Sequence, residues 1–162
     1  REALKDSALG VGGTVALALV VVGLVAAGAA VADVAARSLA DAVALVVLAE
    51  VGAKAATAAL VCLGDAPHEG LGSALTAASG PRALAGVALV TTPATLAGAS
   101  VLGAGGAGVV AGVFTAAIVV AALAFAWARS RLGGVSGDVL GATNEIARVV
   151  GLHAGVIAWT LS

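Results

Sequence analysis

The 162-residue chain is 61% hydrophobic and 10% charged, with a formal net charge of −1 at pH 7. Soluble domains carry about 25% charged residues, so this composition excludes an ordinary soluble globule, and the near-neutral charge gives no support to nucleic-acid binding. Several apolar runs of about 20 residues are typical of helices that cross a membrane. The composition therefore predicts an all-α fold, a polytopic helical membrane protein with a single membrane domain over residues 1–162.

The apolar runs predict about five membrane-spanning helices, separated by short polar or glycine-rich segments. In chain order the expected spans are 14–34, 42–63, 83–102, a fourth that follows the turn 103–108 and ends near 128, and a fifth from 139 to the end. The chain begins with Arg1 and contains no Met. We therefore expect it to be a piece of a longer protein whose N-terminal part is missing.

Successive spans alternate in direction, so the polar segments 1–13, 64–82 and 129–138 should lie on the same side of the membrane. The basic residues expected on that side are Arg1, Lys5, Arg82, Arg129 and Arg131, whereas Arg37 stands alone on the other side. By the positive-inside rule, this excess of basic residues orients the three polar segments toward the cytoplasm.

Polar residues concentrate in one stretch between the fourth and fifth spans, residues 131–145, which read RLGGVSGDVLGATNE. Its three glycines, Gly133, Gly134 and Gly137, allow the backbone to turn tightly and to approach a ligand closely. A flexible loop that presents backbone amides at a helix N-terminus suits a phosphate group. The stretch therefore predicts a phosphate-binding loop.

The residues after this loop follow helical spacing, which places Asp138, Glu145 and Arg148 on one stripe of the last span. Paired carboxylates suit a divalent metal ion. Asp138 has a second interpretation, since an Asp at this position can simply cap the helix. Glu145 lies two turns inside the span, where capping cannot explain it and a carboxylate costs on the order of 2.5–3.5 kcal/mol. Arg148, one turn further on, has the alternative role of neutralising Glu145.

The second span also contains charged residues, Glu50 and Lys54, at the i, i+4 spacing that favours an ion pair on a helix. Mutual neutralisation and contact with a substrate both explain this pair.

The stretch 131–145 resembles the signature GG-x-T-GD-x-LGA-x-x-E of the adenosylcobinamide-GDP ribazoletransferase family, also called cobalamin-5'-phosphate synthase. Ser136 stands in place of the usual Thr. The matching positions are Gly133, Gly134, Gly137, Asp138, Leu140, Gly141, Ala142 and Glu145. Two further segments are similar to family blocks in the same order: KDSALG at 5–10 and PHEGLG at 67–72. Lys54 falls where the family commonly has Arg or Lys.

This resemblance implies a magnesium-dependent membrane phosphotransferase of late cobalamin (vitamin B12) assembly. A hydroxyl of α-ribazole, or of its 5'-phosphate, attacks the cobinamide-side phosphorus of adenosylcobinamide-GDP, and GMP leaves. Expected partners are these substrates, membrane lipid, further copies of the chain or other corrinoid-assembly proteins, and no nucleic acid. The implied location is the prokaryotic cell membrane, with the motif loops facing the cytoplasm.

The resemblance also implies roles for individual residues. Asp138, Glu145 and Asp6 are the expected catalytic residues, and Asp138 and Glu145 are the expected ligands of Mg²⁺. The expected substrate-binding residues are Lys5, Ser7, Glu69, Arg131, Gly133, Gly134, Ser136, Gly137 and Asn144. Family members carry an acidic DG-x-x-D-x-x-DG-type segment before the point where this chain begins, so we expect further metal ligands outside it.

Two other functions have some support in the residues. A CDP-alcohol phosphotransferase-like phospholipid enzyme would also use aspartates on a membrane helix bundle, although its usual DG-x-x-AR…G…D…D arrangement does not occur here. A subunit of a small-solute transporter would fit Pro93 and the intramembrane Glu50 and Lys54. Transport predicts essential residues at the bilayer midplane and no need for metal, whereas a transferase predicts essential residues at the cytoplasmic edge and release of GMP.

Overall fold

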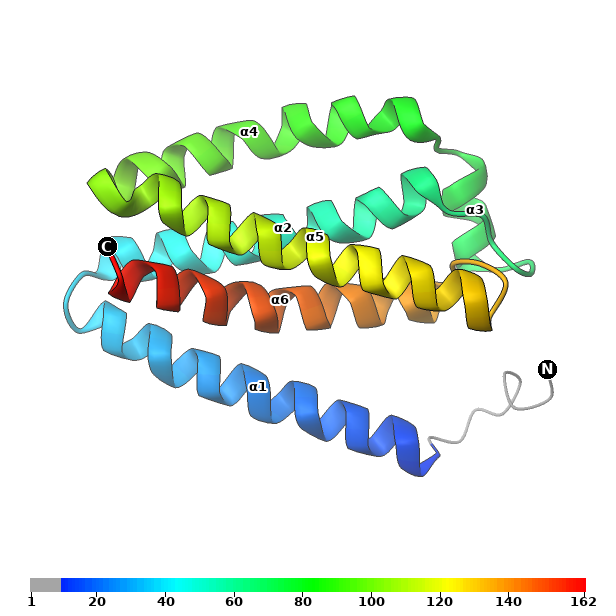
Figure 1. Cartoon of the computed structure of the whole chain (residues 1–162), viewed down its shortest axis with the longest axis horizontal. Helices are drawn as coiled ribbons and strands as arrows, with labels where there is room; N and C mark the ends of the chain where they lie inside the picture. The colour runs from blue at the N-terminus through cyan, green and yellow to red at the C-terminus, as the bar shows by residue number, and fades with distance from the viewer. Residues whose placement is uncertain (1–9) are drawn as a thin grey trace.

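The computed structural model describes residues 10–162, and over that range it consists of α-helices, two 3-10 turns and no β-strand. The helices are α1 (Val11–Ala35), α2 (Leu39–Leu63), α3 (Leu71–Ala77), α4 (Leu84–Val101), α5 (Gly106–Arg131) and α6 (Gly137–Thr160), with 3-10 turns at Pro81–Ala83 and Gly103–Gly105. All but α3 are long and run along the same axis of the molecule (Figure 1). The predicted all-α fold is confirmed.

Four segments in the described range are long and apolar enough to cross a membrane: Val11–Ala35, Leu39–Leu63, Pro81–Val101 and Gly103–Arg131. Helix α6 is of similar length, with 24 residues, but it is more polar because Asp138, Glu145 and Arg148 lie within it. It packs against both α2 and α5. Helix α6 is thus the fifth of the predicted helices and the least apolar, and the chain is a polytopic membrane protein.

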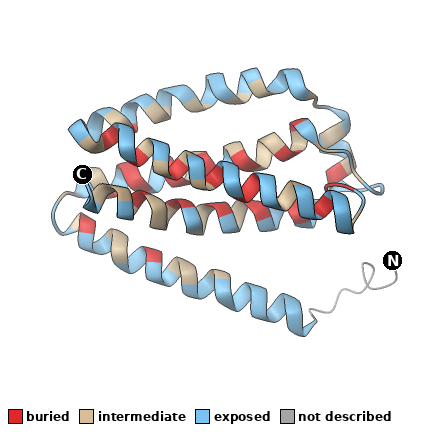
Figure 2. Ribbon diagram, viewed as in Figure 1, coloured by how far each residue is buried: buried red, intermediate tan, exposed pale blue. Residues whose placement is uncertain are grey.

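The centre of the bundle lies where α2, α5 and α6 meet, and Figure 2 shows the buried residues along their facing sides. Leu48, Val113 and Ala147 are completely buried there. Gly155 of α6 lies so close to α5 that a Cβ atom on it would be 3.0 Å from the Val113 side chain. Small residues of this kind let helix backbones approach each other closely, and the resulting van der Waals packing contributes to helix association in lipid.

Helices α1 and α4 are attached more loosely than the other long helices. Residues 11–19 of α1 are all exposed, and Figure 1 shows α1 diverging from α6 toward its N-terminal end. Helix α4 is continuous through Pro93 and packs mainly on α2, leaving an apolar cavity of about 450 Å³ between α2, α4 and α5. Apolar outer surfaces are expected of membrane helices, because lipid is as apolar as the side chains.

The polar connections gather at one end of the bundle, which we call the loop end. Figure 1 places α3, the last turns of α2 and α5 and the first turns of α4 and α6 together there. The predicted meeting of segments 64–82 and 129–138 is therefore confirmed, whereas residues 1–9 lie outside the described range. The sequence did not predict α3, a helix of seven residues within the polar segment 64–82.

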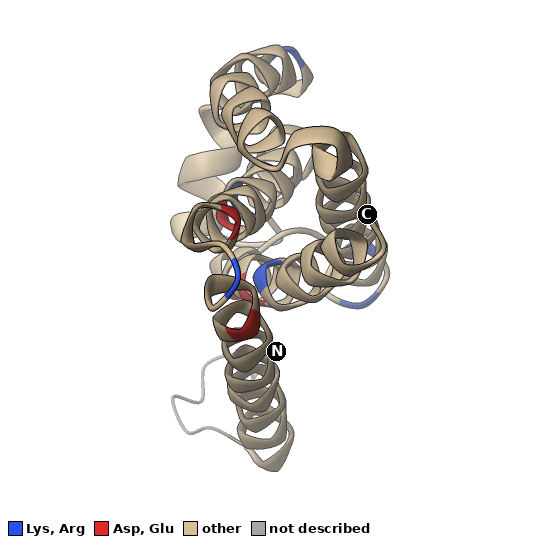
Figure 3. Ribbon diagram, turned by 90° about the vertical axis from the view of Figure 1, so that its left-hand side faces the viewer, with Lys and Arg blue, Asp and Glu red and all other residues tan. Residues whose placement is uncertain are grey.

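The opposite end is held by a small polar cluster. The indole Nε1 of Trp159 donates a hydrogen bond to Asp41 Oδ2 over 3.0 Å, and the guanidinium carbon of Arg37 lies 5.8 Å from the centre of the Trp159 ring. These contacts tie the α1–α2 turn to the last turn of α6. Charged residues are sparse on the rest of the bundle (Figure 3).

Candidate functional site

The predicted glycine-rich loop joins α5 to α6, and its glycines are needed for the packing of the chain itself. Gly133 has a φ of +79°, in the left-handed region that other residues rarely adopt. A Cβ atom on Gly134 would collide with the carbonyl oxygen of Asp65 and lie 3.1 Å from Pro67. The next residue, Val135, donates its N–H to Asp65 O over 2.8 Å. The loop is thus fixed against the segment that follows α2.

The second segment of the resemblance, 67–72, packs on the same loop. A Cβ atom on Gly72 would lie 2.8 Å from the carbonyl oxygen of Val135 and 3.1 Å from the amide nitrogen of Gly137. Glu69 lies just before this contact and is exposed. Two segments separated by about sixty residues in the sequence therefore form one backbone-to-backbone unit at the loop end.

Helix α6 is capped by Ser136, so the interpretation of Asp138 as its cap is wrong. The Ser136 hydroxyl accepts the N–H of Val139 over 3.4 Å, and the residue is 8% exposed. Asp138 lies in the first turn of α6 and is exposed. An acidic residue there is stabilised by the helix dipole. Because Ser136 takes the capping role, the carboxylate of Asp138 is left available to a ligand.

The remaining predicted residues of the loop end are only partly described. Arg131 is the last residue of α5 and is exposed, while Gly137 begins α6. Lys5, Asp6 and Ser7 lie outside the described residues, so their predicted roles stay predictions.

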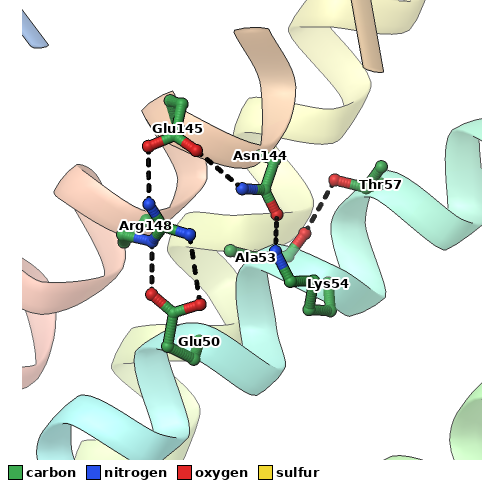
Figure 4. Close-up of polar contacts among 7 residues, drawn as sticks. All are labelled: Glu50, Ala53, Lys54, Thr57, Asn144, Glu145 and Arg148. Carbon is green, nitrogen blue, oxygen red and sulfur yellow. Dashed lines mark hydrogen bonds and ion pairs between the residues drawn. The ribbon is translucent and has the colours of Figure 1, made fainter. Parts of the chain in front are cut away.

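Deeper in the bundle, charged side chains of α2 and α6 meet in what we call the α2–α6 network: Glu50, Lys54, Asn144, Glu145 and Arg148 (Figure 4). Arg148 holds both carboxylates. Its Nε and Nη2 face the two oxygens of Glu50, with 3.3 Å between Nη2 and Glu50 Oε2. Its Nη1 lies 2.6 Å from Glu145 Oε2. The proposed neutralisation of Glu145 by Arg148 is therefore present, and it extends to a second helix.

Of the two interpretations of Glu50 and Lys54, mutual neutralisation is wrong, because Glu50 pairs with Arg148. Lys54 Nζ instead donates to Asn144 Oδ1 over 2.8 Å, and Asn144 Nδ2 donates to Glu145 Oε1 over 2.9 Å. The physical reason is geometric: the planar guanidinium fork of Arg148 matches a carboxylate bidentately, which a lysine ammonium cannot do. Asn144, predicted to bind substrate, thus connects Lys54 to Glu145.

The carboxylates predicted to bind metal are not gathered into a metal centre by the described residues. Within residues 10–162 no group of three or more His, Cys, Asp or Glu side chains is arranged to hold an ion. Both oxygens of Glu145 are engaged by Asn144 and Arg148, and Asp138 lies two turns nearer the loop end. Mg²⁺ commonly takes only one or two carboxylates together with substrate phosphates, so Asp138 fits one ligand of such a site, not a complete one.

Sequence reasoning missed the pairing of Glu50 with Arg148 because it considered only neighbours on one helix. The sequence did contain a signal for this pairing. Glu50 lies 13 residues before the end of α2 and Arg148 lies 11 residues after the start of α6, and these two ends meet at the loop end. Charges at equal depth in antiparallel spans are candidates for pairing across helices.

Comparison with known proteins places this site in a family. The family model described as cobalamin-5-phosphate synthase matches residues 1–156. Three curated relatives, each named adenosylcobinamide-GDP ribazoletransferase, match 99% of the chain. The relative from Halorubrum lacusprofundi is 58% identical, with 62% of its length covered. Those from Halobacterium salinarum and Haloquadratum walsbyi are 48% and 46% identical, with 76% and 61% of their lengths covered.

No solved structure matches the chain significantly. The chain spans 61–76% of the length of these curated relatives. The family match runs through both glycine-rich segments and the α2–α6 network, and it counts against the phospholipid-enzyme and transporter alternatives. The chain belongs to the cobalamin-5-phosphate synthase family.

Proposed function

We propose that the protein containing this chain transfers adenosylcobinamide phosphate from its GDP-activated form to α-ribazole or α-ribazole 5'-phosphate. The name of its curated relatives, adenosylcobinamide-GDP ribazoletransferase, supports this proposal. A ribazole hydroxyl gives up its proton and forms a bond to the cobinamide-side phosphorus. The bond from that phosphorus to the bridging oxygen of the diphosphate breaks, and GMP leaves with that oxygen. The product carries the lower nucleotide loop of cobalamin.

One structural observation carries this proposal beyond the family match. The two glycine-rich segments, 67–72 and 133–137, pack into a single unit, and the exposed carboxylate of Asp138 lies directly beside it at the start of α6. A fixed backbone loop next to an available carboxylate is suited to hold phosphate oxygens and to accept a hydroxyl proton.

In this proposal the residues of the loop end have different roles. Asp138 accepts the ribazole proton or contributes a carboxylate to Mg²⁺, which when bound offsets the charge of the diphosphate. The backbone of Gly133 and Gly137 faces phosphate oxygens, and the guanidinium of Arg131 compensates their charge. Gly134 is buried and donates its N–H to the carbonyl oxygen of Ala128, so it holds the loop in place. Glu69 and Ser136 border the same space, with Ser136 ordering the first turn of α6. Lys5, Asp6 and Ser7 complete the site from the polar segment before α1.

In this proposal Glu145 is less directly involved than Asp138. Its two oxygens are engaged by Asn144 and Arg148, so it would bind a metal ion only by releasing one of them.

We propose further that the loop end faces the cytoplasm of a prokaryotic cell, because Arg82, Arg129 and Arg131 lie there and Arg37 lies at the opposite end. Soluble substrates would then reach the site from the cytoplasm.

The test is GMP release by the intact protein in membranes or detergent, with adenosylcobinamide-GDP, α-ribazole and Mg²⁺. We expect GMP only when both substrates and the metal are present, and a corrinoid product that contains one ribazole. Repeating the assay with α-ribazole 5'-phosphate decides between the two acceptors. A folded protein that releases no GMP with either acceptor would overturn the proposal.

A further inference from the structure

We propose that Lys54, in the middle of α2, binds a phosphate oxygen of the nucleotide-bearing substrate, and that Asn144 holds its ammonium ready for this contact. The inference rests on the proposed function and deepens it. It adds an anion-binding position at a depth in the membrane that the loop end does not reach.

Charge is unevenly distributed within the α2–α6 network. Arg148 contacts both carboxylates, Glu50 and Glu145. Among the described residues, Lys54 is hydrogen-bonded only to the neutral amide oxygen of Asn144, at 2.8 Å. An ammonium has three donors, so two remain for a ligand. Lys54 is therefore a cation whose contacts within the described range include no carboxylate.

Asn144 lies between Lys54 and the carboxylate of Glu145. Its amide oxygen accepts from Lys54 while its amide nitrogen donates to Glu145 over 2.9 Å (Figure 4). This chain of hydrogen bonds has a fixed direction, because a lysine can only donate and an ionised carboxylate can only accept. Asn144 thus orients the ammonium without neutralising it, which an aspartate in its place would do.

Lys54 lies within the membrane-spanning part of α2. It precedes the last residue of α2, Leu63, by nine residues, which corresponds to about 13 Å at 1.5 Å per residue. The hydrocarbon core of a bilayer is about 30 Å thick, so Lys54 lies inside the span, on the half nearer the loop end. An ionisable residue at that depth is costly and marks a binding site by default. Yet Lys54 is exposed.

The surface of α6 between the loop end and Lys54 is open at Gly141. Asp138, Gly141 and Glu145 lie on one stripe of α6 by helical spacing. Gly141 is exposed, and a Cβ atom on it would have no neighbour within 4 Å. Residues 11–19, in the first turns of α1, are exposed as well. Over the described range 10–162, an elongated ligand can therefore extend from the loop end past Gly141 toward Lys54.

The length of this path indicates the class of ligand. Asn144 follows Gly137 by seven residues, which is about 10 Å along α6. A ligand that contacts both the loop and Lys54 must be anionic and extend at least that far. The diphosphate of a nucleotide-activated substrate, with its attached groups, meets both conditions, whereas a single free phosphate does not span the distance.

The experiment compares variants of the intact protein in two assays: the kinetics of GMP release at varied adenosylcobinamide-GDP, and equilibrium binding of GDP. For Lys54→Gln we expect KM to rise and GDP affinity to fall by about tenfold or more, the size expected for a lost hydrogen bond to a charged group, with a smaller change in kcat. Lys54→Arg retains the charge and should stay within about threefold of wild type.

Asn144→Asp tests the separating role of the amide. It should give Lys54 a carboxylate partner and weaken GDP binding in the direction of Lys54→Gln, while the thermal midpoint stays close to that of wild type. Arg37→Gln at the opposite end is the matched control and should leave KM and GDP binding unchanged.

The outcomes separate this inference from the proposed function. GMP release by wild type together with unchanged KM and GDP affinity in Lys54→Gln would overturn the inference and leave the function intact. Absence of GMP release with GDP binding that depends on Lys54 would overturn the function and keep the anion site. Wild type that binds no GDP, or an Asn144→Asp variant that binds it more tightly, would also overturn the inference.

Discussion

The loop end and the α2–α6 network both gather polar residues in an apolar chain, but they are held together differently. At the loop end, backbone contacts hold the segments together, because Gly72 and Gly134 allow close approach. Asp138 is left exposed there. In the network, side-chain contacts hold the helices together, because Arg148 contacts one carboxylate on α2 and one on α6. The first region holds a loop in place while leaving functional groups available. Among residues 10–162, the charged groups of the second region contact one another, except for the ammonium of Lys54, which contacts the amide of Asn144.

The largest effect on the free energy of unfolding is expected from Gly134→Ala, which disrupts the backbone contact at the loop end. The added Cβ would collide with the Asp65 carbonyl oxygen. The backbone fixes the positions of both atoms, so no change of side-chain rotamer can relieve the collision. We expect a loss of about 3 kcal/mol or more in the free energy of unfolding, seen as a lower thermal midpoint in detergent, together with loss of GMP release.

Gly86→Ala is the control for this prediction, because a Cβ atom at that exposed position of α4 meets nothing within 4 Å. It should be neutral or slightly stabilising, since alanine favours a helix over glycine. Equal thermal midpoints for the Gly134 and Gly86 variants would refute the backbone account of the loop end.

A smaller effect is expected from Arg148→Met, which removes the cation shared by the network. Breaking a buried pair costs about 3–5 kcal/mol, and the Arg148 side chain is 24% exposed, so we expect about 2–3 kcal/mol. Adding Glu50→Gln should recover part of this loss, because the second change removes a carboxylate that the first left without its partner. A double-mutant cycle on unfolding free energies measures the coupling.

Arg129→Met serves as the matched arginine, since Arg129 is exposed and its guanidinium carbon lies 5.7 Å from the centre of the Phe125 ring. It should cost well under half as much as Arg148→Met. Additive effects of Glu50→Gln and Arg148→Met would mean that the two residues are not coupled, contrary to the contacts described.

The smallest effect is expected from Ser136→Ala, which distinguishes capping from substrate binding at the loop end. Loss of an N-cap hydroxyl costs about 1 kcal/mol, and the Ser136 hydroxyl accepts the Val139 N–H. We expect a correspondingly lower thermal midpoint, and Ser136→Thr should retain most of the stability. A KM for adenosylcobinamide-GDP that rises tenfold without any loss of stability would show that the hydroxyl contacts phosphate instead.

The sequence predicted the parts of this structure that depend on composition and local spacing. Hydropathy placed the spans to within a few residues, and the glycines of 133–137 marked the loop that joins α5 to α6. The alternation of spans also predicted that the segments 64–82 and 129–138 would meet at one end.

Contacts between helices could not be predicted in the same way. The pairing of Glu50 with Arg148 depends on the rotation and register of α2 against α6, which small residues such as Gly151 and Gly155 set through packing. The i, i+4 rule ranks only neighbours on one helix, and it therefore favoured Lys54 as the partner of Glu50. The capping role of Ser136 was missed for a related reason, since both Ser136 and Asp138 are good caps and only the observed start of α6 decides between them.

The central claim, that Asp138 is the functional carboxylate of the loop end, is tested most directly by the rate of GMP release in Asp138→Asn. Asp33→Asn is the control, because Asp33 is an exposed aspartate near the opposite end, in the last turn of α1. We predict that Asp138→Asn keeps the wild-type thermal midpoint and loses at least about a hundredfold in rate, the scale of general acid–base catalysis, while Asp33→Asn keeps its activity. An Asp138→Asn variant with wild-type rate and an unchanged requirement for Mg²⁺ would contradict the account.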